Sequence, residues 1–212
     1  YYTQIFSDNL SVVPNQIKAL PIRRISFTTS EPERRHLVDE MKALYSKGAL
    51  DQVLRLVDGC LPRDESGNFI PEKEKSDVVH DLLAFLAERM IEMNKEKNAE
   101  IKGFLGWLEG EVGAKVEDLQ GKTVVKGYYN KNEISFEDLV KVLKKNRAKL
   151  SIDPGRREFQ ERLRVEYDSS TAKLGPLLAR IEGTDSLIDQ IVYRLYGLTK
   201  EEIEVVEGRA AE

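Results

Sequence analysis

Two long stretches with helical periodicity constrain the fold of this chain of 212 residues more than any other feature. Between Ser76 and Glu111, apolar residues recur every three or four positions, which places them along one side of an α-helix. A second stretch, from Pro154 to Tyr196, keeps this spacing and resembles a coiled-coil seam diluted by small polar residues. The sequence therefore predicts a mainly α fold, in which long amphipathic helices pack as an antiparallel, coiled-coil-like bundle.

The composition agrees with long, solvated helices. Charged residues make up 33% of the chain, aromatic residues make up 8%, and only 7 residues are prolines, which disfavours sandwiches and barrels of short strands. The formal net charge of −4 argues against a protein that coats nucleic acid over its whole surface. It still allows a local basic face.

The single cysteine, Cys60, cannot form an internal disulfide or a cysteine-based zinc site. We expect this thiol to be buried, and we expect the protein to be cytoplasmic, where cysteines stay reduced. No apolar run approaches the roughly 20 residues that cross a bilayer, and the first residues lack the pattern of a signal peptide. We therefore expect no membrane partner.

Capping residues and glycines predict where the shorter helices begin and end. Ser30 and Glu33 have the spacing of a capping box, Pro32 suits the first turn, and Gly48 is placed to end the same helix. The next apolar stretch predicts a second short helix that ends near Gly59.

Further boundary signals follow in the second half of the chain. Ser135 and Asp138 predict the cap of a helix that runs through Leu150. Asp153-Pro154 predicts the start of the last long helix, with the aspartate as cap and the proline in the first helical position. Gly175-Pro176 predicts an interruption and a kink in that helix.

The region 112–131 predicts no regular structure, because short helical and strand-like patterns alternate there with glycine and asparagine. Near the end of the chain, Gly197 is placed to stop the last long helix. Thr199 and Glu202 then have the spacing of a capping box, which predicts a short final helix.

These signals divide the chain into segments. Residues 29–60 form a helical pair, residues 61–75 are an exposed loop and the best internal linker, and residues 76–212 hold the long-helix bundle and the short C-terminal helix. Residues 1–28 begin with YYTQIF, a short β-prone run without an initiator methionine or an evident partner strand. We expect this segment to be the end of an upstream domain.

Residue patterns that signal catalysis are missing from the sequence. It contains no phosphate-binding P-loop and no histidines paired at metal-ligand spacing. His36 and His80 are isolated, and we expect both at the surface or in an interface. We therefore predict no catalytic residue and no metal site in this chain.

One cluster of charges suits nucleic acid. Between Lys141 and Arg164, nine basic residues outnumber the acidic Asp153, Glu158 and Glu161, so the local balance is +6. Such a block can neutralise several phosphates without reading sequence. The alternative explanation is a solvated helix face whose cations pair with nearby acids. The nine residues are Lys141, Lys144, Lys145, Arg147, Lys149, Arg156, Arg157, Arg162 and Arg164.

Three segments resemble a known family: Val12 to Ile25 (VVPNQIKALPIRRI), His80 to Gly113, and Ile188 to Gly208 (IDQIVYRLYGLTKEEIEVVEG). They are similar to the C-terminal part of bacterial and archaeal restriction-modification methyltransferases that are specific for adenine. In these single-chain, type IIG-like enzymes, a TaqI-like specificity region and a helical tail follow the catalytic domain. Such a parent enzyme can be fused to a restriction endonuclease.

The resemblance implies that residues 1–28 close a target-recognition region that lies against double-stranded DNA. Lys18, Arg23 and Arg24 would then contact the DNA backbone, positioning the duplex without reading its bases. The basic block is the second candidate for backbone contacts, and its candidate residues are Lys141, Lys144, Lys145, Arg147, Lys149, Arg156 and Arg157.

The resemblance also implies S-adenosylmethionine as the cofactor of the parent enzyme, and upstream methyltransferase and recognition domains as partners. The present chain lacks the family's cofactor loop and its Asn/Asp-Pro-Pro-aromatic motif. Its nearest approach, Asp153-Pro154-Gly155, has neither the second proline nor the aromatic residue. We therefore expect no cofactor to bind to this chain itself.

Two functions are compatible with the sequence. The first is a non-catalytic, C-terminal part of a restriction-modification DNA methyltransferase that supports the recognition or positioning of target DNA. The second is a purely structural helical module that mediates domain packing or forms a homodimer without touching DNA.

Overall fold

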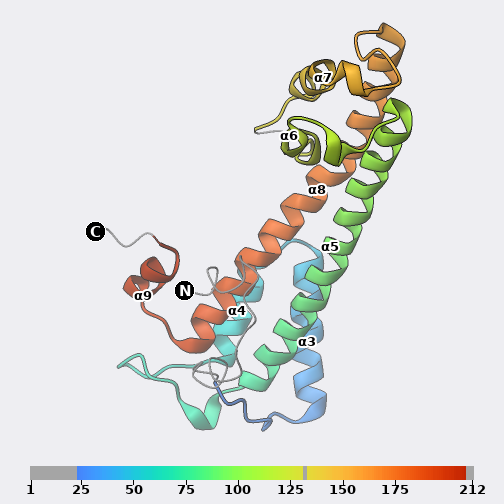
Figure 1. Ribbon diagram of the computed structural model, residues 1–212. Coiled ribbons are helices and arrows are strands. Elements are labelled where there is room, and N and C mark those ends of the chain that lie inside the picture. The colour runs from blue at the N-terminus through green and yellow to red at the C-terminus, as the bar shows by residue number, and fades with distance from the viewer. Residues whose placement is uncertain (1–22, 131–132, 209–212) are drawn as a thin grey trace. The chain divides into compact units, whose positions relative to one another are not determined.

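The computed structural model describes residues 23–130 and 133–208, and the described chain is built from helices (Figure 1). These residues form no β-strand, and their only bridge of that kind joins Arg63 to Phe69. The predicted mainly α fold is confirmed, whereas the β-prone run YYTQIF lies outside the described residues. The elements are α3 (Glu31–Ser46), α4 (Leu50–Cys60), η1 (Pro71–Lys73), α5 (Ser76–Val112), η2 (Val116–Asp118), α6 (Lys122–Lys126), α7 (Phe136–Lys145), η3 (Arg147–Lys149), α8 (Arg157–Tyr196) and α9 (Lys200–Val206).

The chain divides into two compact units, each with its own hydrophobic core. Unit 1 comprises residues 1–87 and 185–212, and unit 2 comprises residues 88–184. The division falls inside α5 and α8 and not in the segment 61–75, which the sequence suggested as the linker. That segment is part of unit 1, and a hydrogen bond from the amide of Lys75 to the carbonyl of Cys60 (2.8 Å) brings its two ends together.

The core of unit 1 is formed by α3, α4, the first part of α5 and the last part of α8. Gly48, with φ of +73°, makes the tight turn between α3 and α4 that the sequence predicted. The apolar faces of the four helices meet at fully buried side chains, which include Met41, Val53, Val57, Leu82, Leu86 and Ile191.

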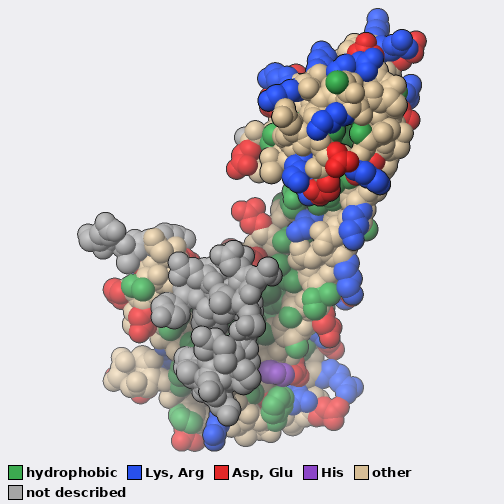
Figure 2. All heavy atoms as spheres, in the orientation of Figure 1, with side chains coloured by type: hydrophobic (Ala, Val, Ile, Leu, Met, Phe, Trp, Pro, Cys, Tyr) green, Lys and Arg blue, Asp and Glu red, His purple; other side chains and the backbone are tan. Residues whose placement is uncertain are grey.

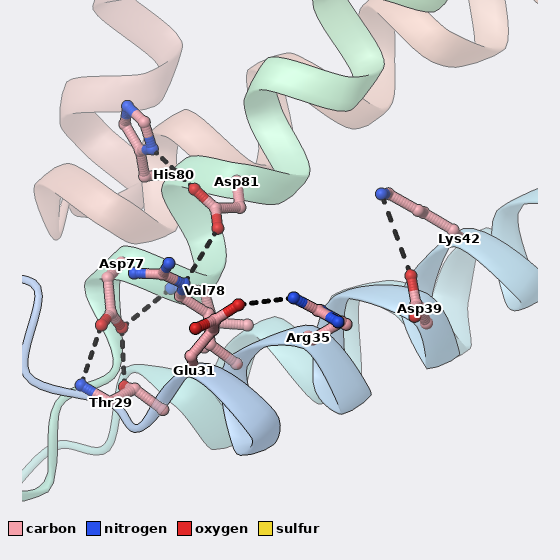
Figure 3. Close-up of polar contacts among 10 residues, drawn as sticks. Thr29, Glu31, Arg35, Asp39, Lys42, Asp77, Val78, His80 and Asp81 are labelled. Atoms are coloured by element: carbon pink, nitrogen blue, oxygen red, sulfur yellow. Dashed lines mark hydrogen bonds and ion pairs between the residues drawn. The ribbon is translucent and has the colours of Figure 1, made fainter.

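The start of α5 is held by a buried carboxylate. Asp77 is fully buried and accepts hydrogen bonds from Thr29 N (2.9 Å) and Thr29 Oγ1 (2.7 Å), and the two side chains point toward each other in Figure 3. Burial alone would raise the pKa of Asp77, but the bonds from Thr29 and Val78 and the charge of Arg34 lower it. This contact ties the entry of α3 to the first turn of α5.

The expected capping box at Ser30 is therefore wrong. The side chain of Ser30 makes no capping bond to α3, and Glu33 pairs instead with Lys75 over 2.7 Å. The preceding residue, Thr29, uses its hydroxyl and its amide on Asp77 of another helix. A tertiary partner has taken the place of the local cap.

Unit 2 is built on an antiparallel pair, the second part of α5 and the first part of α8. Arg162 pairs with Glu111 over 2.7 Å, and Lys173 pairs with Glu100 over 3.2 Å. Moving 11 residues back along α5 thus corresponds to moving 11 residues forward along α8, which is about three helical turns. The antiparallel packing predicted for the long helices is present in this unit.

Tyr128 lies at the centre of the core of unit 2. Its ring stacks on Phe104 at 4.0 Å between centroids, and its hydroxyl shares a 2.7 Å hydrogen bond with the buried hydroxyl of Ser170 on α8. Leu139 and Leu143 of α7 are fully buried in the same core. The hydrogen bond gives each buried hydroxyl a partner and holds the loop that contains Tyr128 against α8.

Several predicted helix boundaries need correction. The last long helix begins at Arg157, because Asp153 does not cap it and accepts instead from Gly155 N (2.9 Å) within a turn. This helix continues through Pro176, where the sequence predicted an interruption. The helix capped by Ser135 ends at Lys145 and not at Leu150. The irregular region 112–131 contains η2 and α6.

Replacing Thr29 by valine should destabilise unit 1, because the substitution removes one hydrogen bond to a buried carboxylate. Bonds of this kind contribute about 1.5–3 kcal/mol, so the free energy of unfolding should fall by that amount in urea titrations followed by circular dichroism. The matched control is Ser30→Ala, which removes a hydroxyl without a capping bond and should stay within about 0.5 kcal/mol of the parent. A larger loss for Ser30→Ala than for Thr29→Val would contradict this assignment.

Candidate nucleic-acid interface

The nine basic residues predicted to form a block lie on consecutive elements of unit 2, and all nine are exposed. Figure 2 shows Lys and Arg side chains gathered over the part of the molecule that carries α7. We call the nine residues together the basic surface. They comprise Lys141, Lys144 and Lys145 of α7, Arg147 and Lys149 of η3, Arg156 in the turn that follows, and Arg157, Arg162 and Arg164 of α8.

The start of α7 is fixed by the capping box that the sequence predicted. Ser135 Oγ accepts from the amide of Asp138 (3.2 Å), and the carboxylate of Asp138 accepts from the amide of Ser135 (3.1 Å). Asp138 also accepts from Ser135 Oγ and from Lys141, and these bonds lower its pKa to about 2. The box therefore fixes where α7 begins, and its buried residues Phe136, Leu139, Val140 and Leu143 leave the lysines on the solvent side.

The end of α7 is anchored by Asn146, a buried polar residue. Its side chain donates to the carbonyls of Gln120 (2.9 Å) and Val142 (2.8 Å) and accepts from the amide of Gln120 (2.9 Å). These three bonds turn the chain at the end of α7, so that Lys144 and Lys145 remain in solvent. No local sequence pattern indicates this role of Asn146, because its partner Gln120 lies 26 residues away.

The turn that carries Arg156 lies beside η3. Arg147 Nε is 3.6 Å from Asp153 Oδ1, and the amide of Arg156 donates to the carbonyl of Asp153 (3.1 Å). Residues from the end of α7 to the start of α8 therefore form one continuous stretch of surface.

Six residues of the basic surface have partners within the chain. Three pair with a carboxylate no more than six residues away in the sequence: Lys141 with Asp138, Arg147 with Asp153, and Arg157 with Glu161. Lys149 donates to the backbone carbonyl of Asp118, Arg162 pairs with Glu111, and Arg164 pairs with Glu137. Within residues 23–130 and 133–208, no hydrogen bond or ion pair engages the side chains of Lys144, Lys145 and Arg156.

The folded surface is less positive than its sequence. Three of the carboxylates that pair with it, Glu111, Glu137 and Asp138, come from outside the segment 141–164. Adding these three negative charges reduces the local balance from +6 to +3. Glu111 could not be foreseen as a partner, because it lies 51 residues from Arg162 in the sequence.

The second group of predicted DNA contacts lies in unit 1. Lys18 lies outside the described residues, and Arg24 is exposed. Arg23 is engaged internally: it pairs with Glu74 over 2.6 Å, lies over the ring of Phe69, and donates to the carbonyl of Leu195. Its guanidinium thus satisfies a carbonyl at the end of α8, where a cation also offsets the negative end of the helix dipole.

The histidines and the cysteine considered for chemistry all lie in unit 1. His36 is exposed, and His80 is exposed with its Nδ1 3.1 Å from Asp81 Oδ1. Cys60 is 3% exposed, and burial raises the pKa of its thiol to about 11, as expected for a structural cysteine. No group of histidine, cysteine, aspartate and glutamate that could hold a metal ion occurs in the described ranges. No helix among those residues is long and apolar enough to cross a membrane.

The described chain is thus a helical protein with two cores and a basic surface on the second. Its residues 76–192 match the domain of unknown function DUF8810, and the chain belongs to this family. The matched segment begins with the first residue of α5 and ends within the last turns of α8, so it contains the whole basic surface. Neither the curated proteins nor the solved structures gave a significant match.

Replacing Ser135 by alanine should destabilise unit 2, because it removes the cap of α7. The expected loss at pH 7 is about 1 kcal/mol in the free energy of unfolding, measured by urea titration. The bonded Asp138 has a lowered pKa, so its contribution is complete above the ordinary value of about 3.9 and is lost as the pH falls toward 2. The difference between Ser135→Ala and the parent should therefore shrink between pH 4 and pH 2. A difference that stays constant over this range would refute the link to Asp138.

Proposed function

We propose that this chain is a non-catalytic helical part of a restriction-modification DNA methyltransferase, and that its basic surface contacts the phosphates of double-stranded DNA. The observation that carries the DNA contact is the exposure of Lys144, Lys145 and Arg156 without a partner in the described chain. The resemblance of three sequence segments to that family supports the identity of the parent enzyme.

Phosphate contacts of this kind position DNA without reading its sequence. Each unpaired cation that meets a phosphate releases a counterion from the DNA. For each such contact, the logarithm of the binding constant falls by about 0.9 when the salt concentration rises tenfold, and this dependence is the salt slope. Three contacts predict a slope of about −2.7, and therefore weak binding that salt easily reverses. Such a surface can hold a duplex that an upstream recognition domain has selected, but it cannot select a site by itself.

The aromatic residues of unit 2 favour a duplex over a single strand. Proteins that bind single strands stack bases on exposed aromatic rings. All aromatic side chains of unit 2 in the described chain are buried or half-buried. Phe136, which contacts the basic surface, is covered by the guanidinium of Arg164 at 3.6 Å from the ring centre.

The remaining parts of this function follow from the resemblance. S-adenosylmethionine would bind to the upstream methyltransferase domain, and an upstream recognition domain would read the target bases. Within this proposal the protein works in the cytoplasm, where its DNA substrate lies. The chain described here contributes helices that carry a phosphate-binding surface.

A second candidate function is a structural module for domain packing or homodimer formation. It is favoured by the six cations of the basic surface that already have partners, as expected of a solvated helix face. Gly103, Gly106 and Gly110 of α5 also leave an open face, because a Cβ atom added at any of them would meet no atom within 4 Å. In this case the protein would not bind DNA.

A salt titration should separate the two functions. With a labelled duplex of about 20 base pairs, we expect binding at about 50 mM salt and an affinity about fortyfold lower at 200 mM, as a slope of −2.7 requires. Replacing Lys144, Lys145 and Arg156 by alanine should weaken binding and flatten the slope, because the unpaired cations are removed.

The matched control replaces three exposed cations of unit 2 outside the basic surface, Lys95, Lys102 and Arg180, by alanine. It changes the net charge equally and should keep both the affinity and the slope close to those of the parent. If the protein without substitutions does not bind at 50 mM salt, the DNA function is wrong and the structural module is preferred. Equal effects of the two triple variants would show that only net charge matters.

A further inference from the structure

Two arginines of the basic surface are held by carboxylates from other elements. Arg162 binds Glu111 of α5 through both Nε (3.2 Å) and Nη2 (2.7 Å). Arg164 binds Glu137 in the first turn of α7 through Nη2 (2.8 Å). Both arginines therefore use on a carboxylate the same planar donors that would bind a phosphate.

Both ion pairs are accessible to water. The side chains of Arg162 and Arg164 are 56% and 45% exposed, and those of Glu111 and Glu137 are 29% and 63% exposed. Ion pairs with partners this accessible to water contribute little to stability. A phosphate that approaches the basic surface can therefore replace either carboxylate.

We propose that Glu111 and Glu137 compete with DNA phosphates for Arg162 and Arg164, and thereby set the DNA affinity of the basic surface. This inference rests on the proposed function, because it assumes that the surface meets a duplex. In this proposal, Lys144, Lys145 and Arg156 contact phosphates without first losing an internal partner. Arg162 and Arg164 contact phosphates only after their ion pairs with Glu111 and Glu137 have opened.

The competition has a distinct signature in the salt dependence. While an arginine stays paired with its carboxylate, it neutralises no phosphate and releases no counterion from the DNA. A paired arginine therefore adds nothing to the slope. Removing the carboxylates makes both arginines free before binding, so that each then contributes a full contact to the slope.

The test compares the protein without substitutions with the variant Glu111→Gln/Glu137→Gln in salt titrations with the same duplex. With two further contacts, the slope should steepen from about −2.7 to about −4.5, and the affinity at 50 mM salt should rise at least about tenfold. Combining this variant with Arg162→Gln/Arg164→Gln should abolish the gain, because the freed arginines are then absent. Circular dichroism checks that each variant is folded.

The matched control is Glu96→Gln/Glu100→Gln, which changes the net charge of unit 2 by the same two units. Glu100 pairs with Lys173, 11 residues along α8 from Arg162, or about 16 Å at 1.5 Å per residue. This separation exceeds the Debye length of about 10 Å at 0.1 M salt. The control should therefore keep the parent slope.

The outcomes distinguish this inference from the proposed function. If the parent binds and Glu111→Gln/Glu137→Gln keeps its slope, or if the control steepens the slope equally, the competition is overturned and the DNA function stands. If no variant binds, both proposals are overturned. If only Glu111→Gln/Glu137→Gln binds, the competition is supported, and the protein without substitutions lacks the proposed DNA binding.

Discussion

The packing of the apolar stripes of α5 and α8 is the constraint on which the rest of the structure depends. Each helix contributes to both cores: along α5, Leu86 belongs to the core of unit 1 and Met93 to that of unit 2. Because both helices continue through the division, the chain has two cores without a separate linker. Burial of these stripes supplies the main driving force for folding, since it removes apolar surface from water. The shorter helices are placed by the core that each one covers.

This packing also determines the charge of the basic surface. The antiparallel arrangement within unit 2 brings the end of α5 beside the start of α8, and Glu111 thereby reaches Arg162. Packing of α7 on the same core likewise brings Glu137 to Arg164. Core packing therefore decides which cations keep an internal partner and which face solvent. Lys144 and Lys145 remain in solvent, because Asn146 fixes the turn at the end of α7.

At two positions that the sequence singled out, the folded chain supplies a distant partner. Ser30 has the sequence pattern of a cap, but its neighbour Thr29 bonds Asp77, 48 residues away, and the chain enters α3 without a side-chain cap. The resemblance implied a DNA contact for Arg23, which stays a prediction, and in the structure Arg23 contacts Glu74 and the end of α8. In both cases a distant partner competes with the role that the local pattern indicated. A sequence pattern that spans only a few residues carries no information about partners that are distant in the sequence.

The sequence alone determined the longer helices and those ends that depend on residues within one turn. The boxes at Ser135 and Thr199 and the left-handed glycine Gly197 are local, because each joins groups no more than a few residues apart. The sequence also determined that a basic block exists. Only the tertiary structure decided the division into two cores and the number of cations left without a carboxylate. These depend on apolar burial and on charge pairs between residues that are dozens of positions apart, which only the folded chain brings together.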